Sequence, residues 1–363
     1  MDSPQNIPLG NTKAQYEHLI PQVMERIAEV VHSGRFILGP NVQGFEQEAA
    51  EFLGVPRTVG VANGTDALVL ALNAMGIGPG DEVICPSFTF YATAEAIAQR
   101  GATPVFADID PATLNLDPDD VAAKVTEKTR ALMPVHLFGR VMPLGGLAEF
   151  GVPILEDAAQ AFGAEGVART GVLSTFSFYP SKNLFAFGDA GLVAANDEEL
   201  ADRVTLLRFH GSREKREFQA VGYNSRLDEL QAAVLRLFLG EIDGWNQARR
   251  DAAARYRDLG LGELCELPPD EPGHVYHMYV VRSPERDRLA QALAEAGIGH
   301  ASYYVTPLHL QPALRYLGYE DGALPETERA ARENLALPMW AGIPGEAQER
   351  IVSVIREAAA VRA

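Results

Sequence analysis

Short apolar runs alternate with amphipathic stretches between residues 56 and 195. Seven runs of four to six residues are apolar at successive positions, which is typical of strands covered on both faces. They lie at 58–62, 82–85, 103–107, 131–135, 152–155, 173–178 and 191–195. The stretches between them, such as 66–75 and 92–100, have the spacing of helices. This alternation predicts an α/β fold with a mostly parallel, seven-stranded sheet sandwiched by helices.

The pattern differs on either side of this region. Helical spacing at 21–32 and again up to Leu53 precedes it, and a helix-rich segment at 226–259 follows it. Beyond Pro268-Pro269, a strand at 275–281, a helix at 285–296 and a last helix from Gly345 predict a smaller α+β domain. We therefore expect a large domain over residues 1–245, including the N-terminal segment, and a small domain over residues 246–363.

Composition and charge narrow the class of protein. The 363 residues are 47% apolar and 22% charged, as in an ordinary globular enzyme. A net charge of −18 disfavours non-specific nucleic-acid binding but permits an anionic ligand held by a few local cations. Two distant cysteines and the lack of a His-Glu-x-x-His motif predict neither disulfides nor a metal site. With no signal peptide and no apolar run of about 18 residues, we expect a cytoplasmic protein without membrane partners.

The familiar phosphate-binding motifs are absent. Gly34-x-x-x-x-Gly39 is followed by Pro40-Asn41 where a P-loop needs Lys and Ser or Thr. What remains is Asn63-Gly64-Thr65-Asp66, which follows a predicted strand and opens a predicted helix. Free backbone N–H groups at such a turn favour an anion. A capping turn without a ligand is the alternative.

Lys182 stands out among the five lysines of the chain. The other four lie in polar or charged segments, whereas Lys182 follows the apolar strand that ends in Phe176-Ser-Phe-Tyr-Pro-Ser181. A lysine there is unusual unless it is paired or functional. Burial lowers the pKa of an amine and favours the neutral form that a Schiff base requires. The alternative is a lysine whose stem lies along the strand end while its amine reaches water.

Two acids, Glu156 and Asp157, end another predicted strand, where open α/β folds bind ligands. Successive strand residues point to opposite faces, so only one of the two can serve a given site. In pyridoxal chemistry such an acid keeps the pyridine nitrogen protonated. Capping of the next helix is the competing interpretation.

Taken together, these segments resemble the DegT/DnrJ/StrS-type sugar aminotransferases, a branch of the fold-type I pyridoxal phosphate enzymes. The resemblance covers most of the chain. It rests on Gly34-Arg-Phe-Ile-Leu-Gly-Pro40, Ala62-Asn-Gly-Thr-Asp-Ala67, Pro86-Ser-Phe-Thr-Phe90, Glu156-Asp-Ala-Ala-Gln160, Ser177-Phe-Tyr-Pro-Ser-Lys182 and Gly222-Tyr-Asn-Ser-Arg226, in this order. It implies that the large domain binds pyridoxal 5'-phosphate and that the protein is a transaminase.

The resemblance also assigns roles to residues at the matching positions. Lys182 would hold the cofactor and move the substrate proton, Asp157 would pair with the pyridine nitrogen, and Gln160 would bond near the ring hydroxyl. Phe90 would lie against the ring, with core packing as its alternative.

Other matching positions would bind the cofactor phosphate. Gly64 and Thr65 would offer backbone N–H groups, and Ser177 would offer a hydroxyl. Asn224 would reach the phosphate from a second subunit, which implies a homodimer with shared active sites. Taken alone, Asn224 is a loop residue suited to a turn.

The segments 209–215, 222–231 and 304–311 are closest to members that aminate carbon 3 of 3-keto sugars. We therefore expect a dTDP-3-keto-6-deoxyhexose as substrate and L-glutamate as amino donor, in amino-sugar biosynthesis. Arg213 and Lys215 would bind the nucleotide diphosphate or the donor carboxylate, unless they form a solvated charge run. Tyr179 and His309 are candidate sugar contacts, and His309 could equally be structural.

Alternatives remain open at this point. Amination at carbon 4 of a dTDP-, UDP- or GDP-linked 4-keto sugar is one, and a cofactor-binding regulator without catalysis is another. Related dehydratases replace the lysine with histidine, so Lys182 argues against them. The segments 136–155 and 163–174 are shorter than is usual in the family, and we expect only about two helical turns around 143–150.

Overall fold

A computed structural model describes residues 6–360 of the chain. Its main sheet consists of β1 (Arg57–Val61), β2 (Glu82–Pro86), β3 (Thr103–Ala107), β4 (Thr129–Leu132), β5 (Leu155–Asp157), β6 (Leu173–Ser177) and β7 (Gly191–Ala195). Hydrogen bonds join β1-β7-β6-β5 and β3-β2-β4, and parallel bridges at Leu132–Ile154 and Val135–Asp157 connect β4 to β5. Only β7 runs antiparallel to its neighbours within this sheet. The mostly parallel, seven-stranded sheet is therefore confirmed.

β4 and β5 are the two strands whose bounds differ most from the prediction. The apolar runs 131–135 and 152–155 predict longer pairing than the ladder shows. Pro134 and Pro153 lie in these runs, and proline has no N–H to donate to a ladder. Their carbonyls still accept, from the N–H groups of Asp157 and Leu132 respectively, both at 2.9 Å. The segments stay adjacent although the regular strands are short.

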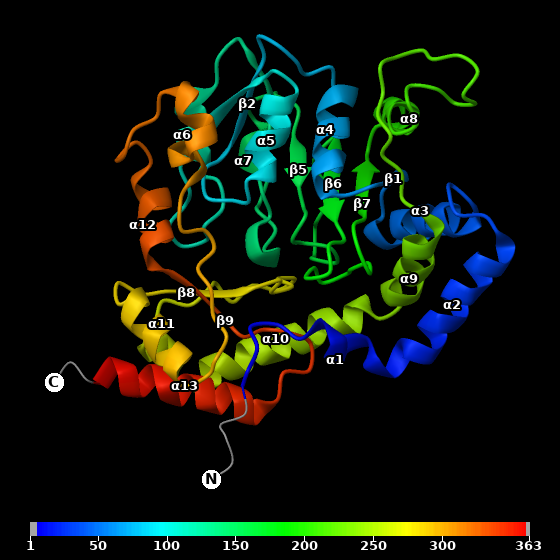
Figure 1. Cartoon of the computed structure of the whole chain (residues 1–363). Coiled ribbons are helices and arrows are strands. Elements are labelled where there is room, and N and C mark those ends of the chain that lie inside the picture. The colour runs from blue at the N-terminus through cyan, green and yellow to red at the C-terminus, as the bar shows by residue number, and fades with distance from the viewer. Residues whose placement is uncertain (1–5, 361–363) are drawn as a thin grey trace.

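Helices cover both faces of the sheet (Figure 1). One face packs against α4 (Gly64–Ala74), α5 (Ala92–Gln99) and α8 (Glu198–Leu207). The other packs against α3 (Pro40–Leu53), α6 (Pro118–Lys124), the short α7 (Gly145–Ala148) and α9 (Glu229–Leu239). β7 shows why its run is apolar throughout: Leu192 and Ala194 enter one core, and Val193 and Ala195 enter the other. α7 has four residues, which is about one helical turn where two turns were expected.

The C-terminal part has a core of its own. It contains the antiparallel pair β8 (Tyr279–Arg282) and β9 (Asn334–Leu337), with α10 (Ile242–Asp258), α11 (Arg286–Glu295), α12 (Pro325–Glu333) and α13 (Gly345–Ala360). Single 3-10 turns lie at Glu17–Leu19, Leu137–Gly139, Leu261–Glu263 and Leu308–Leu310, with a longer one at Pro312–Leu317. α10 runs through residue 245, and the division of the chain at that residue stays a prediction.

The N-terminal segment lies against this C-terminal part (Figure 1). Ile7 forms a parallel bridge with Ile298 and belongs to the C-terminal core. α1 (Thr12–Tyr16) follows, and α2 (Ile20–Ser33) then packs on α9 of the large part. The first described residues therefore join the two parts of the molecule.

Within residues 6–360, no helix is long and apolar enough to cross a bilayer. The same residues contain no cluster of three or more His, Cys, Asp or Glu side chains suited to a metal ion.

Candidate active site

The carboxyl ends of β1, β5 and β6 bring three distant segments to one edge of the sheet. β5 ends at Asp157, β6 ends at Ser177 shortly before Lys182, and β1 leads into Gly64 at the start of α4. These three strands run in the same direction, because β7 lies antiparallel between β1 and β6. Ligands of open α/β folds bind at this edge.

Asp157 is a buried carboxylate that faces this edge. Its Oδ2 accepts a hydrogen bond from Thr93 Oγ1 at 2.8 Å, and its Oδ1 accepts one from the Ala159 N–H at 3.2 Å. Burial raises the pKa of Asp157, an effect opposed by these two hydrogen bonds and by the nearby Lys182. None of the cations in residues 6–360 forms an ion pair with it. A cationic ring nitrogen would supply the missing partner.

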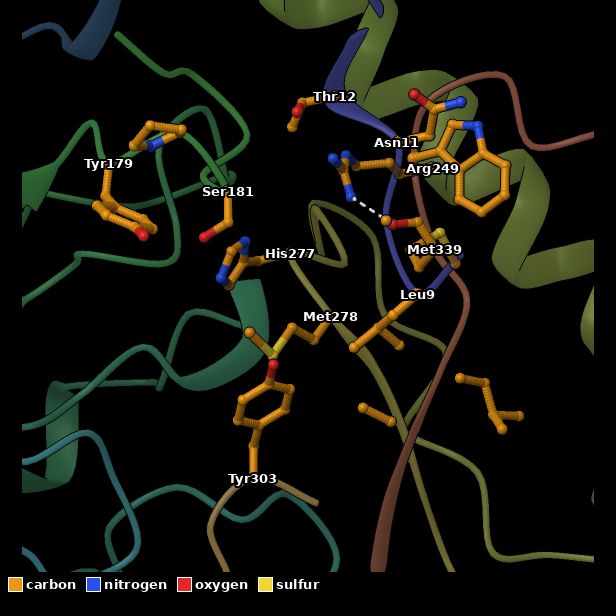
Figure 2. A pocket seen from close by; sticks show the side chains of 15 residues that line it. Leu9, Asn11, Thr12, Tyr179, Ser181, Arg249, His277, Met278, Tyr303 and Met339 are labelled. Carbon is orange, nitrogen blue, oxygen red and sulfur yellow. Dashed lines mark hydrogen bonds between the residues drawn. The ribbon is translucent and has the colours of Figure 1, made fainter. Parts of the chain in front are cut away.

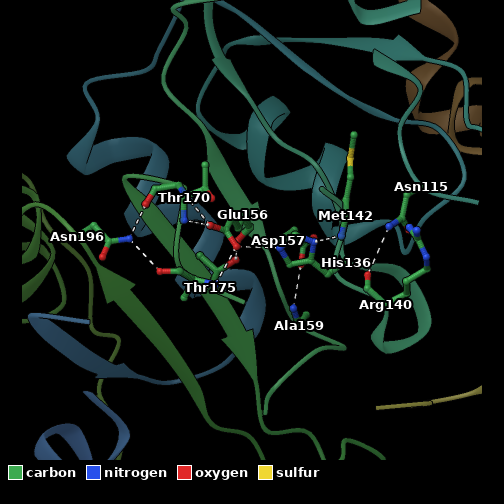
Figure 3. Close-up of polar contacts among 12 residues, drawn as sticks. Asn115, His136, Arg140, Met142, Glu156, Asp157, Ala159, Thr170, Thr175 and Asn196 are labelled. Carbon is green, nitrogen blue, oxygen red and sulfur yellow. Dashed lines mark hydrogen bonds and ion pairs between the residues drawn. The ribbon is translucent and has the colours of Figure 1, made fainter. Parts of the chain in front are cut away.

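Glu156 points to the other face and is fully engaged there (Figure 3). It accepts hydrogen bonds from His136 Nε2 at 2.8 Å and from the backbone N–H groups of Ala168 at 2.9 Å and Gly171 at 2.6 Å. Although burial acts to raise the pKa of Glu156, these donors hold it below its ordinary value. Glu156 thus anchors the short 163–174 connection, and Asp157 is the acid left for the site.

Lys182 lies in the loop after β6 and is only partly exposed. Its backbone N–H donates to the Tyr179 carbonyl at 2.8 Å, which fixes the tight turn that carries it. Burial lowers the pKa of its amine to about 8, although the negative charge of Asp157 acts in the opposite direction. A neutral amine is thus accessible close to neutral pH, as a covalent attachment to an aldehyde requires.

The turn before α4 has the shape of an anion cradle. Asn63 caps the helix by accepting from the Asp66 N–H at 2.8 Å, and the first-turn N–H groups of Gly64 and Thr65 have no intrahelical acceptors. A side chain on Gly64 would place its Cβ 2.6 Å from Cβ of Ser177, so only glycine permits this approach. The predicted phosphate residues Gly64, Thr65 and Ser177 therefore come together.

Phe90 and Gln160 flank the same edge. The Phe90 ring is 58% exposed, which argues against core packing for it, and its centroid lies 6.3 Å from that of Tyr304. Gln160 is buried, accepts from the Phe138 N–H at 2.7 Å and donates through Nε2 to Tyr304 Oη at 3.1 Å. An exposed aromatic face beside an anchored amide suits a flat, polar ring.

These residues fit pyridoxal phosphate. Asp157 is a desolvated carboxylate without an ion-pair partner among the described residues, and Lys182 is an amine with a lowered pKa. The Gly64 turn suits a phosphate, and Phe90 presents an uncovered aromatic face. When bound, this cofactor withdraws electrons from the reacting carbon of an amino substrate.

Sequence reasoning missed three residues of the site, Thr93, His277 and Tyr304. Thr93 orients Asp157, and Tyr304 contacts both Gln160 and Phe90. His277 lies near Lys182: burial lowers the pKa of His277, and the positive charge of Lys182 lowers it further. They lie on a helix and on two segments distant along the chain, with no strand-end signal to reveal them.

A cavity of about 400 Å³ opens beside the Lys182 loop (Figure 2). Tyr179, a predicted sugar contact, is 56% exposed and lines it together with Ser181, His277 and Tyr303. The position of Tyr179 at the mouth of this cavity suits contact with a substrate.

Within residues 6–360, neither Arg213 nor Lys215 forms a hydrogen bond or ion pair with the site residues described above. Arg213 pairs with Asp202 at 3.5 Å, and Asp202 pairs with Arg57 at the first residue of β1. Arg213 therefore lies at the edge of the sheet opposite to the strand ends that form the site. The amine of Lys215 lies 4.9 Å from the ring centroid of Phe209. The predicted substrate role of the two cations stays a prediction.

Asn224 and His309 differ in their surroundings. Asn224 is exposed and forms an isolated antiparallel bridge with Phe209. His309 is buried, with Nδ1 at 2.7 Å from Ser87 Oγ and Nε2 at 3.2 Å from Glu328 Oε1. Both ring nitrogens of His309 are thus occupied within the protein, which supports its structural alternative.

Comparison with known proteins places this geometry in context. The model of the DegT/DnrJ/EryC1/StrS aminotransferase family matches residues 18–356. A pleiotropic regulatory protein of Geobacillus stearothermophilus is 46% identical over 97% of this chain and 98% of its own. A dTDP-3-amino-3,4,6-trideoxy-alpha-D-glucose transaminase of Streptomyces venezuelae is 42% identical over 97% of this chain and 96% of its own.

Two solved structures have the same fold as this chain. The crystal structure of Streptomyces venezuelae DesV in complex with a ketimine intermediate is 43% identical, covers 98% of this chain and 99% of that one, and superposes with a TM-score of 0.94. Bacillus subtilis NtdA with bound cofactor PMP is 29% identical, covers 94% of this chain and 82% of that one, and gives a TM-score of 0.89.

Proposed function

Because the chain belongs to the DegT/DnrJ/EryC1/StrS aminotransferase family, we propose that it transfers an amino group to a nucleotide-linked keto-sugar with pyridoxal 5'-phosphate as cofactor. One observation carries the proposal: Lys182, an amine with a lowered pKa, lies near the buried and unpaired carboxylate of Asp157. The family, its relatives and the cofactor-bound structures confirm the predicted family, fold, cofactor and aminotransferase activity.

In this function each residue of the site would act on a particular group of the cofactor or the substrate. Asp157 would accept a hydrogen bond from the protonated ring nitrogen, and Phe90 would lie against the ring. Lys182 would hold the cofactor covalently, and its released amine would then move a proton at the reacting carbon of the substrate. Gly64, Thr65 and Ser177 would bind the phosphate through N–H and O–H donors. A fixed ring and phosphate position the reacting bond, which is the main contribution of the protein.

For the finer substrate, we infer amination at carbon 3 of a dTDP-3-keto-6-deoxyhexose with L-glutamate as donor. The Streptomyces venezuelae relative, named for a 3-amino sugar, supports carbon 3. A 4-keto sugar is the alternative. A regulator without catalysis is the other alternative, favoured by the name of the Geobacillus relative and opposed by the complete Lys182 and Asp157 pair.

We also infer a homodimer with shared active sites. Phe36 and Ile37 are 45% and 47% exposed and pack beside the start of α9 through backbone contacts with Glu229 and Asp228. Phe187, 40% exposed, donates its N–H to Gln231 of the same helix. This apolar surface borders the Lys182 loop, so a second copy bound to it would lie beside the cofactor site.

In such a dimer, Asn224 of one subunit would serve the phosphate of the other. Arg213 and Lys215 would supply positive charge for the diphosphate of the nucleotide. We also propose that the protein is located in the cytoplasm.

The test begins with the purified protein incubated with pyridoxal phosphate. We expect a visible absorbance band that borohydride removes, with the label on Lys182 after peptide mapping. Transfer from L-glutamate to a dTDP-3-keto sugar should give an amino-sugar and 2-oxoglutarate by mass spectrometry. A loaded protein that transfers no amino group to 3-keto or 4-keto nucleotide sugars would support the regulator. A protein that never acquires the band would refute the enzyme.

A further inference from the structure

The cavity beside Lys182 extends into the C-terminal part of the molecule, beyond the residues that fit the cofactor (Figure 2). Ser181 lines it next to Lys182, and the N-terminal residues Asn11 and Thr12 line it from another side. Arg249 of α10 and Trp340, which follows β9, also line it. The part of the cavity near Arg249 has no role in binding the cofactor.

Arg249 is a buried cation that has no acidic partner in the described part of the chain. Its side chain is 2% exposed, and none of the acids in residues 6–360 forms an ion pair with it. The guanidinium donates only to neutral oxygens: Gln15 Oε1 at 2.8 Å, the Tyr276 carbonyl at 3.3 Å and the Met339 carbonyl at 3.5 Å. Its Nε has no acceptor among the described residues. Burying a charge without a counter-charge is unfavourable unless a ligand compensates it.

His277 is a second incomplete group in the same cavity. It is 4% exposed, and neither ring nitrogen has a hydrogen-bond partner among residues 6–360. Burial lowers the pKa of His277, and the positive charges of Lys182 and Arg249 lower it further. The ring is therefore neutral, with one donor and one acceptor to offer. Figure 2 shows the His277 ring directly below Ser181, with the Arg249 guanidinium to the right of both.

Resting on the proposed function, we propose that this cavity is the donor subsite, in which Arg249 and His277 bind the side-chain carboxylate of an acidic amino acid. The reacting carbon of the donor must lie beside Lys182. A carboxylate on the α-carbon stays close to that point, whereas a side-chain carboxylate extends past His277 towards Arg249. It would pair the buried guanidinium and accept from the imidazole N–H. An amino acid without that carboxylate would leave the cation unpaired, which gives selectivity for an acidic donor.

Binding of glutarate to the cofactor-loaded protein tests the subsite without turnover. Glutarate has the two carboxylates of glutamate but no amine to react, and Trp340 in the cavity wall can report its binding by fluorescence. We expect saturable binding, and roughly tenfold or more weaker binding by Arg249→Met. Pentanoate, with one carboxylate fewer, should bind more weakly to the unaltered protein. Absence of a glutarate effect, or equal affinity in Arg249→Met, would overturn the proposal.

His277→Phe provides a second variant in case Arg249→Met does not fold, since Arg249 also joins two backbone segments. It removes both ring nitrogens, and we expect weakened glutarate binding. His274→Phe is the matched control, because His274 is also buried but lines a different cavity. Equal loss in His274→Phe and His277→Phe would indicate general disturbance and refute the specific role of His277.

Donor selectivity distinguishes this inference from the proposed function. The ratio of kcat/KM for L-glutamate to that for L-alanine should fall roughly tenfold or more in Arg249→Met, because alanine has no side-chain carboxylate. An equal loss for both donors would assign Arg249 to the framework and refute the subsite. If the unaltered protein forms the covalent cofactor band and aminates the sugar, failure of these tests removes only the subsite. If it does neither, the proposed function itself fails.

Discussion

Glu156 and Asp157 are neighbours on β5, but their side chains enter opposite faces of the sheet and meet different surroundings. Glu156 receives donors from His136 and from three backbone N–H groups, so its charge is compensated within the chain (Figure 3). Asp157 receives two donors, and no cation within residues 6–360 forms an ion pair with it. A fully satisfied buried acid stabilises a fold, whereas an incompletely satisfied one marks a place for a ligand.

The largest expected effect is on transamination, from a substitution on the face of the sheet where Asp157 lies. Lys182→Ala should lower transamination about a thousandfold or more, because it removes both covalent attachment and proton transfer. Circular dichroism and thermal unfolding should change little, since Lys182 makes no side-chain hydrogen bond with the described residues. Steady-state amination of the keto-sugar measures the loss. Turnover close to that of the unaltered protein would contradict the assigned role.

Asp157→Asn should lower kcat much more than it changes the stability of the protein. The amide cannot keep the ring nitrogen charged, and we expect roughly a hundredfold lower kcat. Stability should stay the same or increase, because a desolvated charge is removed. Urea unfolding of the cofactor-free protein, beside kinetics of the loaded one, separates the two effects. Unchanged kcat would show that Asp157 is not the partner of the ring.

Glu156→Gln is the matched variant on the other face. It breaks the charged contact with His136 and leaves a backbone N–H without its carboxylate, so it should lower the free energy of unfolding by about 2–3 kcal/mol. The kcat per folded molecule should fall far less than in Asp157→Asn. If Glu156→Gln instead lost activity while keeping its stability, the roles of the two acids would have to be exchanged.

The pH dependence of cofactor attachment also tests the difference between Asp157 and Glu156. The neutral amine of Lys182 reacts, so the rate at which the cofactor-free protein acquires the visible band should rise with pH through about 8. Asp157→Asn removes a negative charge that stabilises the ammonium, and the midpoint should therefore move to lower pH. Glu156→Gln should leave it in place. A midpoint near the ordinary value of lysine, 10.5, would contradict the effect of burial.

The smallest effect is expected at Phe90. Phe90→Ala removes a ring that is 58% exposed, so the free energy of unfolding should change by less than about 0.5 kcal/mol. Cofactor affinity should fall about three- to tenfold, the contribution of one aromatic contact. Titration with pyridoxal phosphate measures this, and Phe218→Ala, at another exposed phenylalanine, serves as the control. Equal affinities in both variants would remove Phe90 from the site.

The sequence was sufficient for the parts of the site that follow strand ends. The apolar runs predict the sheet, and Gly64, Asp157 and Ser177, which lie at or within two residues of the ends of three of these runs, are therefore placed at one edge. Alternation alone separates the faces of Glu156 and Asp157 without saying which face holds the ligand, so the resemblance made the choice of Asp157, and the structure shows Glu156 engaged on the other face. Backbone N–H groups of the 163–174 connection donate to Glu156, together with His136.

Residues from distant segments could not be predicted in this way. Arg249 and His277 meet Ser181 only because α10, the segment before β8 and the Lys182 loop pack together. Each alone has an ordinary local pattern, and their lack of partners becomes visible only in three dimensions. Arg213 and Lys215 illustrate the reverse case, since their local charge pattern gives no information about which edge of the sheet they occupy.

The N-terminal segment has a consequence for the order of assembly. Gln15 holds Arg249, Asn11 and Thr12 line the donor cavity, and Ile7 pairs with Ile298. These contacts join residues 7–15 to residues 249–298, so they exist only after both of these segments have been made. A partly made chain can fold much of its sheet but cannot close this cavity. The proposed donor cavity therefore closes only when residues 7–15 meet residues 249–298.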